Sequence, residues 1–284
     1  MSSPREKLEK LLNGDEFLLM PCCYDALSAL LIEQAGFPLT FMSGFAVSAA
    51  RLGLPDTGLI SYGEMVDAGR TICGRVSIPV IGDADTGYGN AVNVKRTISG
   101  YAAAGFACAM IEDQLMPKRC GHTKGKMVVE RKEAFTRIRA AVDAREEGAD
   151  ILIMARTDAR TTHGMDEALS RCRGFADLGA DIIFLEAPES REEMERLCRE
   201  IPGYKMANML LHGKTPLVSP EDLTEMGFKI AAYPLTLISS AISAIQHALQ
   251  TLKQGDYPAH IDFAGLKDIV GFTDYYREEE RYAG

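Results

Sequence analysis

Short apolar runs recur eight times along the chain, and amphipathic segments with helical spacing separate them. The runs lie at 17–21, 39–43, 79–83, 107–112, 151–157, 181–186, 205–209 and 229–234. Because they are apolar throughout, without alternating polar positions, they predict strands of a parallel sheet that is buried on both faces. Helices are expected between them, among others at 62–73, 92–104, 131–147, 165–178 and 191–200.

Eight strand–helix units in 284 residues fit a (β/α)8 TIM-type barrel, which commonly forms a single domain of about 250 residues. A doubly wound open sheet is the alternative, but Cys22-Cys23-Tyr24-Asp25 follows the first strand where such folds carry a glycine-rich turn. Gly105 and Gly227 each precede a predicted strand and are expected to end helices in the left-handed conformation. We therefore predict one α/β barrel domain over residues 1–284, with 256–284 as a C-terminal helical arm.

The charge pattern limits the partners. A net charge of −9 without a basic run argues against nucleic acid and against anionic membrane surfaces. No apolar stretch reaches the roughly 18 residues that span a bilayer, and the first residues lack a signal-peptide core. The seven cysteines show no paired spacing, as expected of reduced thiols. We predict a cytoplasmic protein that acts on a small molecule.

Polar residues stand at the C-terminal ends of the predicted strands. In a barrel these ends share one rim, where active sites are found. Any single polar residue there fits an ordinary solvated loop, but apolar strands that end repeatedly in acid, amide or arginine indicate an active-site rim. The residues concerned are Ser43, Asp83, Asp85, Glu112, Arg156, Asp158, Glu186 and Asn208.

The densest group of carboxylates is Asp83 and Asp85, followed by Glu112-Asp113 after the next strand. Hard oxygen ligands from neighbouring loops suit Mg²⁺, with Mn²⁺ as the alternative. A plainer interpretation is an acidic loop that caps the helix beginning near Asn90. The cluster nevertheless favours a cation, because an acidic protein that binds an anionic substrate needs positive charge at the site.

A second group surrounds Cys120, in the run Lys118-Arg119-Cys120-Gly121-His122. Basic neighbours favour the thiolate, which acts as a nucleophile or as a proton donor and acceptor. A structural cysteine is the plainer interpretation. A segment bounded by Pro117 and Gly125 suits a mobile lid, and nothing in its spacing resembles a zinc site. Of the remaining thiols, Cys22 and Cys23 are expected to follow the first strand. His212 is expected on the rim after the seventh.

Ordered motifs run along nearly the whole chain. They are 21–26, Ser43-Gly44, 53–58, 83–89, 111–114, 118–122, 155–159, 185–187 and 275–278. Together they resemble the isocitrate lyase/phosphoenolpyruvate mutase superfamily. This resemblance implies a barrel whose last helix is swapped between the subunits of a homotetramer, with 263–282 as the exchanged arm.

The resemblance also implies roles for single residues. Asp83, Asp85 and Glu112 would hold Mg²⁺ directly or through water, with Asp56 close by. Arg156 would bind a carboxylate and stabilise the enolate, and Cys120 would protonate the departing carbon during cleavage. The other substrate contacts implied are Ser43, Gly44 and Phe45 at the oxo-acid end, and Gly121, His122, Glu186, Asn208 and Thr215 around the second carboxylate.

The reaction that the resemblance implies is cleavage of a di- or tricarboxylate. We predict a magnesium-dependent carbon–carbon lyase that splits 2,3-dimethylmalate or 2-methylisocitrate into pyruvate, or a similar 2-oxo acid, and a carboxylic acid. Pro234 resembles the residue of these lyases, where oxaloacetate hydrolases of the petal-death type carry serine. Phe45 stands where methylisocitrate lyases often have glycine, which favours a smaller, partly apolar substrate. Carboxyphosphonoenolpyruvate phosphonomutase, oxaloacetate hydrolase and a non-catalytic binding barrel are the alternatives.

Overall fold

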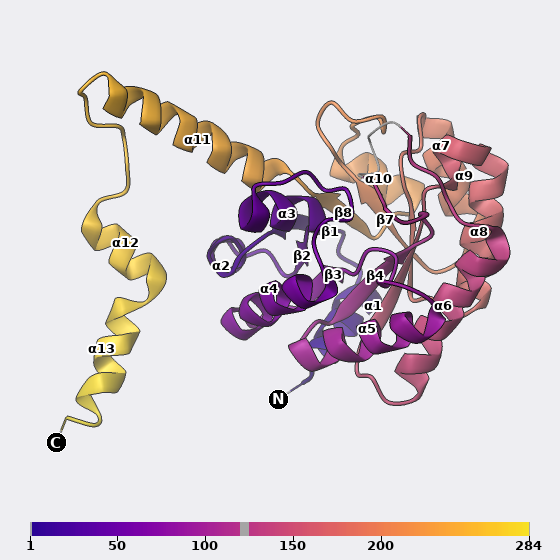
Figure 1. The fold of residues 1–284 in the computed structure, drawn as a ribbon, viewed down its shortest axis with the longest axis horizontal. Coiled ribbons are helices and arrows are strands. Elements are labelled where there is room, and N and C mark those ends of the chain that lie inside the picture. The colour runs from indigo at the N-terminus through magenta and orange to yellow at the C-terminus, as the bar shows by residue number, and fades with distance from the viewer. Residues whose placement is uncertain (1, 120–124, 284) are drawn as a thin grey trace. The chain divides into compact units, whose positions relative to one another are not determined.

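The computed structural model describes residues 2–119 and 125–283. Eight parallel strands close into a barrel in chain order, and the last pairs with the first (Figure 1). The strands are β1 Leu18–Cys23, β2 Thr40–Met42, β3 Val80–Asp83, β4 Cys108–Glu112, β5 Leu152–Thr157, β6 Ile182–Leu185, β7 Tyr204–Asn208 and β8 Ile230–Tyr233. The predicted barrel is confirmed. One detail was wrong: Cys22 and Cys23 lie inside β1 and do not follow it.

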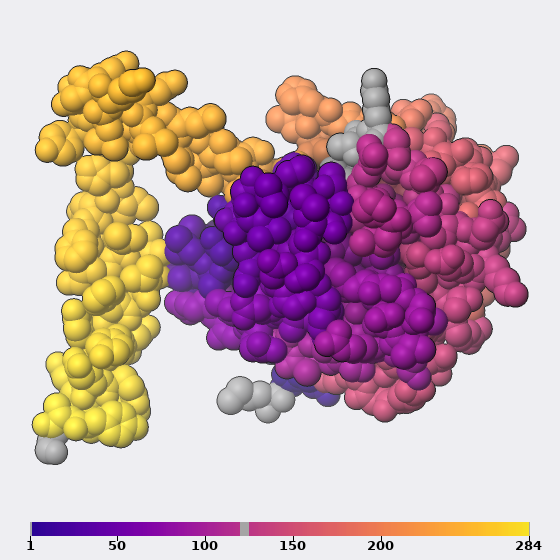
Figure 2. Space-filling model, in the orientation of Figure 1, coloured from indigo at the N-terminus to yellow at the C-terminus, as the bar shows by residue number. Residues whose placement is uncertain are grey.

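Helices alternate with the strands along the chain, and the five that the sequence predicted are all present. The helices are α1 Pro4–Asn13, α2 Ala26–Gln34, α3 Gly44–Leu52, α4 Tyr62–Arg75, α5 Ala91–Ala104, α6 Arg131–Glu146, α7 Ala159–His163, α8 Met165–Asp177, α9 Arg191–Glu200, α10 Pro220–Met226, α11 Thr236–Lys253, α12 Phe263–Val270 and α13 Phe272–Glu280. Gly105 ends α5 with a φ of 97° and Gly227 ends α10 with a φ of 99°, as expected of left-handed caps. In the space-filling view, α3, α4 and α5 form a continuous surface on one side of the barrel (Figure 2).

Two apolar layers hold the barrel together. The outer layer lies between strands and helices, and the inner layer fills the barrel with every second strand residue, such as Leu18, Met20 and Cys22 of β1. Leu8 and Leu12 of α1 belong to the inner layer, so this helix closes the N-terminal end of the barrel. A cavity can therefore form only at the opposite end, where the strands terminate.

We expect Leu8→Ala to lower the free energy of unfolding by about 2–5 kcal/mol, because it opens a void beneath a closed layer. Leu8 is fully buried, whereas Leu27 of α2 is 46% exposed. Chemical denaturation of Leu8→Ala, with Leu27→Ala as the matched control, measures the difference. Equal losses in the two variants would contradict the role of α1 as a plug.

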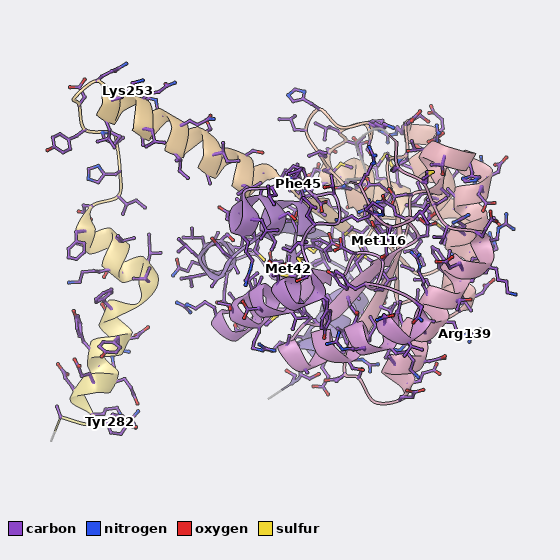
Figure 3. All side chains as sticks on the ribbon, viewed as in Figure 1. Met42, Phe45, Met116, Arg139, Lys253 and Tyr282 are labelled. Carbon is purple, nitrogen blue, oxygen red and sulfur yellow. The ribbon has the colours of Figure 1, made fainter. Side chains whose placement is uncertain are left out.

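The contacts divide the chain into two units, Met1–Leu237 and Ile238–Gly284. The second unit contains most of α11 together with α12 and α13, and its side chains project on all sides of these helices (Figure 3). Many of them are apolar and exposed, including Leu249 at 61%, Phe263 at 74% and Tyr275 at 62%. No helix in the described part of the chain is long and apolar enough to cross a bilayer.

Candidate active site

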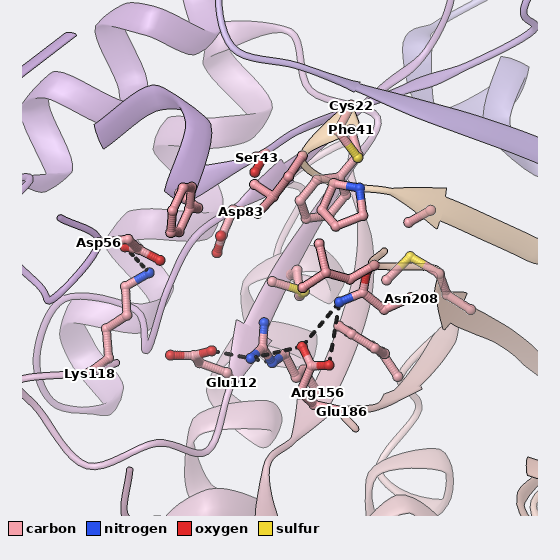
Figure 4. A pocket seen from close by; sticks show the side chains of 18 of the residues that line it. Cys22, Phe41, Ser43, Asp56, Asp83, Glu112, Lys118, Arg156, Glu186 and Asn208 are labelled. Carbon is pink, nitrogen blue, oxygen red and sulfur yellow. Dashed lines mark hydrogen bonds and ion pairs between the residues drawn. The ribbon is translucent and has the colours of Figure 1, made fainter. Parts of the chain in front are cut away.

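The C-terminal ends of the strands surround one cavity (Figure 4). Nine residues that the sequence predicted for the site line this cavity: Ser43, Phe45, Asp56, Asp83, Glu112, Arg156, Glu186, Asn208 and Pro234. Further lining comes from Lys118 and Arg119 and from the apolar side chains of Phe41, Met110, Phe184, Met206, Leu210 and Leu235. The rim that the sequence predicted is thus a real concavity with a charged side and an apolar side.

Some predicted residues lie apart from the cavity lining. Gly44 stands behind Asp83, and its backbone N–H donates to Asp83 Oδ2 (3.2 Å). Thr215 is buried, and its hydroxyl has no hydrogen-bond partner among the described residues. Neither these two nor Asp85 and His212 contribute to the described lining. Cys120, Gly121 and His122 lie outside the described residues.

Asp83 and Asp85 belong to a tight loop at the end of β3. Asp83 Oδ1 accepts from the backbone N–H of Asp85 (3.0 Å), and Tyr101 donates its hydroxyl to the Asp83 carbonyl (2.7 Å). Asp85 itself has a φ of 49°, a left-handed backbone that costs about 1–3 kcal/mol for a residue with a side chain. Strain of this kind is found where a loop is held for function.

Lys118 supplies a positive charge inside the acidic group. Its Nζ lies 2.5 Å from Asp56 Oδ1 and 2.6 Å from Asp85 Oδ1, and its side chain is 4% exposed. Glu112 Oε1 is also buried, yet no described residue gives it a hydrogen bond. One ammonium therefore contacts two carboxylates of this group, while an oxygen of a third has no hydrogen-bond partner among the described residues.

Burial, more than mutual repulsion, disfavours the charged form of the carboxylates in this group. Burial, and then the neighbouring Asp85, raise the pKa of Asp83 to about 6. Burial also raises the pKa of Glu112 well above its usual value, although Arg156 opposes the shift. An additional cation would relieve this excess of negative charge.

The donor chemistry of the acidic group fits a divalent cation. Carboxylate oxygens are the ligands that Mg²⁺ and Mn²⁺ prefer, and Glu112 Oε1 is a buried oxygen to which no described residue donates. In the part of the chain that the structure describes, no three of these groups already meet at metal-binding spacing. Lys118 contacts Asp56 and Asp85 there.

Arg156 lies beside the acidic group, at the end of β5. Its Nη2 is 3.1 Å from Glu186 Oε2, and its Nε is 3.4 Å from Glu112 Oε2. Asn208 Nδ2 donates to Glu186 Oε1 (3.3 Å), which orients that carboxylate toward the guanidinium (Figure 4). A buried arginine at the edge of a cavity is suited to bind a carboxylate.

The apolar side of the cavity is the uppermost layer of the barrel interior. Phe184 of β6 places its ring 5.2 Å from Cζ of Arg156, a cation–π contact. Met110 of β4 and Met206 of β7 belong to the inner layer as well and also line the cavity. This surface can accept alkyl groups, whereas the opposite side accepts charged oxygens.

Several lining residues escaped the sequence analysis, and Phe184 and Lys118 are the two whose contacts matter most to the site. Phe184 lies two positions before Glu186, so strand periodicity places both side chains on the same face, and this signal could have found it. Lys118 was noticed only as a neighbour of Cys120. No local signal pairs it with Asp56 and Asp85, because those contacts join distant parts of the chain.

The six cysteines that the structure describes are poor nucleophiles. Cys22, Cys23, Cys108 and Cys172 are buried, and Cys73 and Cys198 are partly buried. Burial raises the pKa of Cys23, Cys73 and Cys198 to about 12. Thiols with such values stay protonated at neutral pH and react slowly.

A network behind the cavity begins at Glu167 and gives a test of acid stability. Arg131 and Arg171 pair with Glu167 and lower its pKa to about 2. Because the pKa is lowered in the folded state, the stabilisation is complete above about 4.5 and is lost as the pH falls toward 2. We expect Glu167→Gln to lower the free energy of unfolding by about 2 kcal/mol at pH 7.

The difference between the Glu167→Gln variant and the unmodified protein should shrink as the pH falls from 4.5 toward 2. Urea denaturation at several pH values measures it. Glu195→Gln is the control, because Glu195 forms an exposed pair with Arg191 and such pairs contribute little. A constant difference across this range would show that the ion pairs are not the cause.

Comparisons with known proteins agree with this geometry. The sequence profile of the phosphoenolpyruvate phosphomutase family matches residues 8–253. The chain is 43% identical to a 2,3-dimethylmalate lyase of Eubacterium barkeri, over 98% of this chain and 97% of that protein. It is 39% identical to a chloroplastic carboxyvinyl-carboxyphosphonate phosphorylmutase of Arabidopsis thaliana, covering 98% and 84%. A 2-methylisocitrate lyase of Aeropyrum pernix is 36% identical, covering 98% and 91%.

Solved structures give the same grouping. A 2,3-dimethylmalate lyase, described as a PEP mutase/isocitrate lyase superfamily member, superposes with a TM-score of 0.95 at 37% identity, covering 100% of this chain and 97% of that one. Oxaloacetate acetylhydrolase in complex with 3,3-difluorooxalacetate reaches 0.95 at 35% identity, covering 99% and 98%. Phosphonopyruvate hydrolase in complex with oxalate and Mg²⁺ reaches 0.88 at 27% identity, covering 100% of both chains. The predicted superfamily is confirmed, and the prediction of a lyase agrees with these relatives.

Proposed function

Because the chain belongs to the phosphoenolpyruvate phosphomutase family, we propose that it is a magnesium-dependent carbon–carbon lyase. Its substrate is a 2-hydroxy acid of the malate type with alkyl substituents, 2,3-dimethylmalate or 2-methylisocitrate. The products are pyruvate, or a similar 2-oxo acid, and a carboxylic acid. One observation carries the proposal: a single cavity brings together an acidic group, a buried arginine and an apolar surface.

The acidic group is the proposed metal site. Asp83, Asp85 and Glu112, with Asp56 close by, would hold Mg²⁺ directly or through water. Such an ion acts as a Lewis acid and supplies the positive charge that an enolate requires. The burial of Asp83 and Glu112, which raises the pKa of both carboxyl groups, supports this role, because a bound cation would offset the loss of hydration. A solved relative is a complex with oxalate and Mg²⁺.

The protein's own residues bind the substrate and supply the proton. Arg156 would hold a carboxylate and share the charge of the enolate. As the carbon–carbon bond breaks, its electron pair stays on the departing carbon, and the 2-hydroxyl becomes the oxo group and would release its proton to solvent, from which Cys120 is later reprotonated. Cys120 would deliver a proton to that carbon, and in the reverse condensation it would remove the proton.

The remaining predicted contacts fix the ends of the substrate. Ser43, Gly44 and Phe45 would contact the oxo-acid end. Around the second carboxylate we place Gly121, His122, Glu186, Asn208 and Thr215, with Pro234 in the wall of the cavity. The apolar side around Phe184 supports alkyl substituents, because a methyl group buried there gains about 0.8 kcal/mol or more.

We also propose a cytoplasmic homotetramer in which the arm at 256–284 is exchanged between subunits. The unit from Ile238 to Gly284 supports this, because α11 carries an exposed apolar stripe. Ile242, Ile245, Leu249 and Leu252 recur at helical spacing and are 46–61% exposed. A second copy of the chain would cover this stripe. Sedimentation equilibrium should give four times the 31.0 kDa of one chain.

A substrate panel tests the lyase proposal. Purified protein with Mg²⁺ and a thiol reductant is offered 2-alkylmalates, 2,3-dimethylmalate, 2-methylisocitrate and oxaloacetate, and pyruvate is followed by coupling to lactate dehydrogenase. We expect pyruvate from a dimethyl- or alkyl-substituted acid. If oxaloacetate is the one acid of the panel that is cleaved, and it yields oxalate and acetate, the activity is that of an oxaloacetate hydrolase. A change in the phosphorus NMR spectrum with phosphonate substrates, and no pyruvate from the malates, would assign a phosphonomutase.

A further inference from the structure

Arg156 is held by a carboxylate behind the cavity. Asp158, two residues further along the chain, accepts from Arg156 Nε through Oδ2 (2.8 Å) and from Nη2 through Oδ1 (3.1 Å). This paired contact occupies one edge of the planar guanidinium. None of the described residues accepts a hydrogen bond from Nη1, so this nitrogen remains for a ligand in the cavity.

Asp158 is fixed by two further groups. Its backbone N–H donates to Asp113 Oδ1 (2.9 Å), and Arg171 in turn donates to Asp113 Oδ2 (3.0 Å). Its carboxylate accepts from Lys126 Nζ through Oδ1 at 2.6 Å. The side chains of Lys126 and Asp158 are 1% and 0% exposed. The backbone of Asp158 is therefore set by Asp113, and its carboxylate is set by Lys126 together with Arg156.

The charges of this group explain why two cations surround one carboxylate. Burial alone would raise the pKa of Asp158, but Arg156 and Lys126 together hold it below its usual value. Breaking a buried ion pair by removing one partner leaves a charge without compensation. Without the Lys126 ammonium, Arg156 would have to neutralise Asp158 more completely, at the expense of its contacts in the cavity.

We propose that Lys126 is a positioning residue: its ammonium fixes Asp158, and Asp158 holds Arg156 so that Nη1, which no described residue engages, can bind the substrate carboxylate. This inference rests on the function proposed above. In the described part of the chain, neither Lys126 nor Asp158 lines the cavity. Both therefore act through Arg156.

The first test compares two buried lysines. Lys126→Met should raise KM for the substrate and Kd for oxalate by about 10- to 100-fold, with a smaller change in kcat, as for other residues that orient a ligand-binding group. Lys205→Met is the matched control. Lys205 is also buried, but its Nζ donates to the carbonyls of Ile201 (3.2 Å) and Gly203 (2.7 Å), near the start of β7. It should lower the melting temperature without changing KM or Kd.

The second test is a double-mutant cycle. Asp158→Asn removes the charge through which Lys126 acts. If the two residues form one relay, the loss of oxalate affinity in the double variant should not exceed that of Asp158→Asn alone. Additive losses would show that Lys126 acts independently of Asp158 and would overturn the proposal. Should Lys126→Met fail to fold, Lys126→Gln enters the cycle in its place.

The outcomes separate this proposal from the proposed reaction. Oxalate affinity is measured by calorimetry and needs no turnover. If the unmodified protein binds oxalate but forms no pyruvate, the lyase proposal fails. The Kd of Lys126→Met for oxalate then still decides whether Lys126 positions Arg156. Unchanged KM and Kd in Lys126→Met, or a loss equal to that of Lys205→Met, would overturn the relay. If the unmodified protein forms pyruvate but binds no oxalate, the lyase proposal stands and the KM of Lys126→Met decides the present one.

Discussion

Asp83→Asn should lower kcat/KM by about 10³-fold, because a metal ion at such a site is worth several kcal/mol of charge stabilisation. The activity that remains should no longer rise when Mg²⁺ is added. The substitution keeps the size of the side chain but removes one negative charge from the proposed metal site. It also breaks one of two contacts, since an amide cannot accept from both the Asp85 and Gly44 N–H groups.

Thermal unfolding gives an independent measure of the same effect. We expect saturating Mg²⁺ to raise the melting temperature of the unmodified protein by about 5 °C, and to leave that of Asp83→Asn nearly unchanged. Asp181→Asn is the matched control. Asp181 lies just before β6, where it accepts from Arg145 Nη1 (2.6 Å) and from the Ile153 N–H (2.8 Å).

The Asp181→Asn variant should unfold at a lower temperature but keep both its activity and its response to Mg²⁺. An Asp83→Asn variant that still gains stability from Mg²⁺ and still turns over would place the metal elsewhere. Equal losses of activity in the two variants would reduce the role of Asp83 to folding.

The barrel could be predicted from the sequence because its signals are local. A strand buried on both faces needs a continuous apolar run, and a helix that returns toward the sheet needs a cap such as Gly227. These requirements hold wherever the element lies in the fold. The ends of β1 were less certain, because the apolar residues Cys22 and Cys23 continue the run into what reads as a turn.

The site was predictable only where position along a strand decides it. Asp83 and Glu112 end their strands and Arg156 stands one residue before the end of its strand, and the barrel brings such ends together. The ion pairs made by Lys118 and Lys126 were not predictable. They join residues far apart in the chain, and neither lysine stands in a strand or helix of the described structure. Sequence spacing carries no information about such contacts.

A second limit is that the sequence does not show which residues of the rim face the cavity. Gly44 and Thr215 have the right neighbours in sequence, yet neither lines the described cavity. Asp85 contacts Lys118 and has a left-handed backbone, which a linear pattern of residues does not reveal. Conversely, Phe184 was overlooked because it looks like any other residue of an apolar strand.

Cys120→Ser should lower kcat by about 10²- to 10⁴-fold, the usual contribution of a positioned acid or base, while oxalate affinity stays nearly constant. A hydroxyl is a much weaker acid than a thiol, so serine delivers a proton to the departing carbon far more slowly. Binding does not require that proton. The loss should therefore appear in kcat, in contrast to the loss expected for Lys126→Met.

Alkylation with iodoacetamide at pH 7.5 tests the same assignment chemically. Burial keeps the six described cysteines protonated, so peptide mapping should find Cys120 as the site that reacts fastest, with activity lost in proportion to its labelling. Cys198→Ser is the control. This half-buried thiol has a pKa of about 12, and its replacement should change neither the rate of inactivation nor kcat. Full activity after complete labelling of Cys120 would exclude it as the proton donor and leave the acidic group and Arg156 to carry the reaction without it.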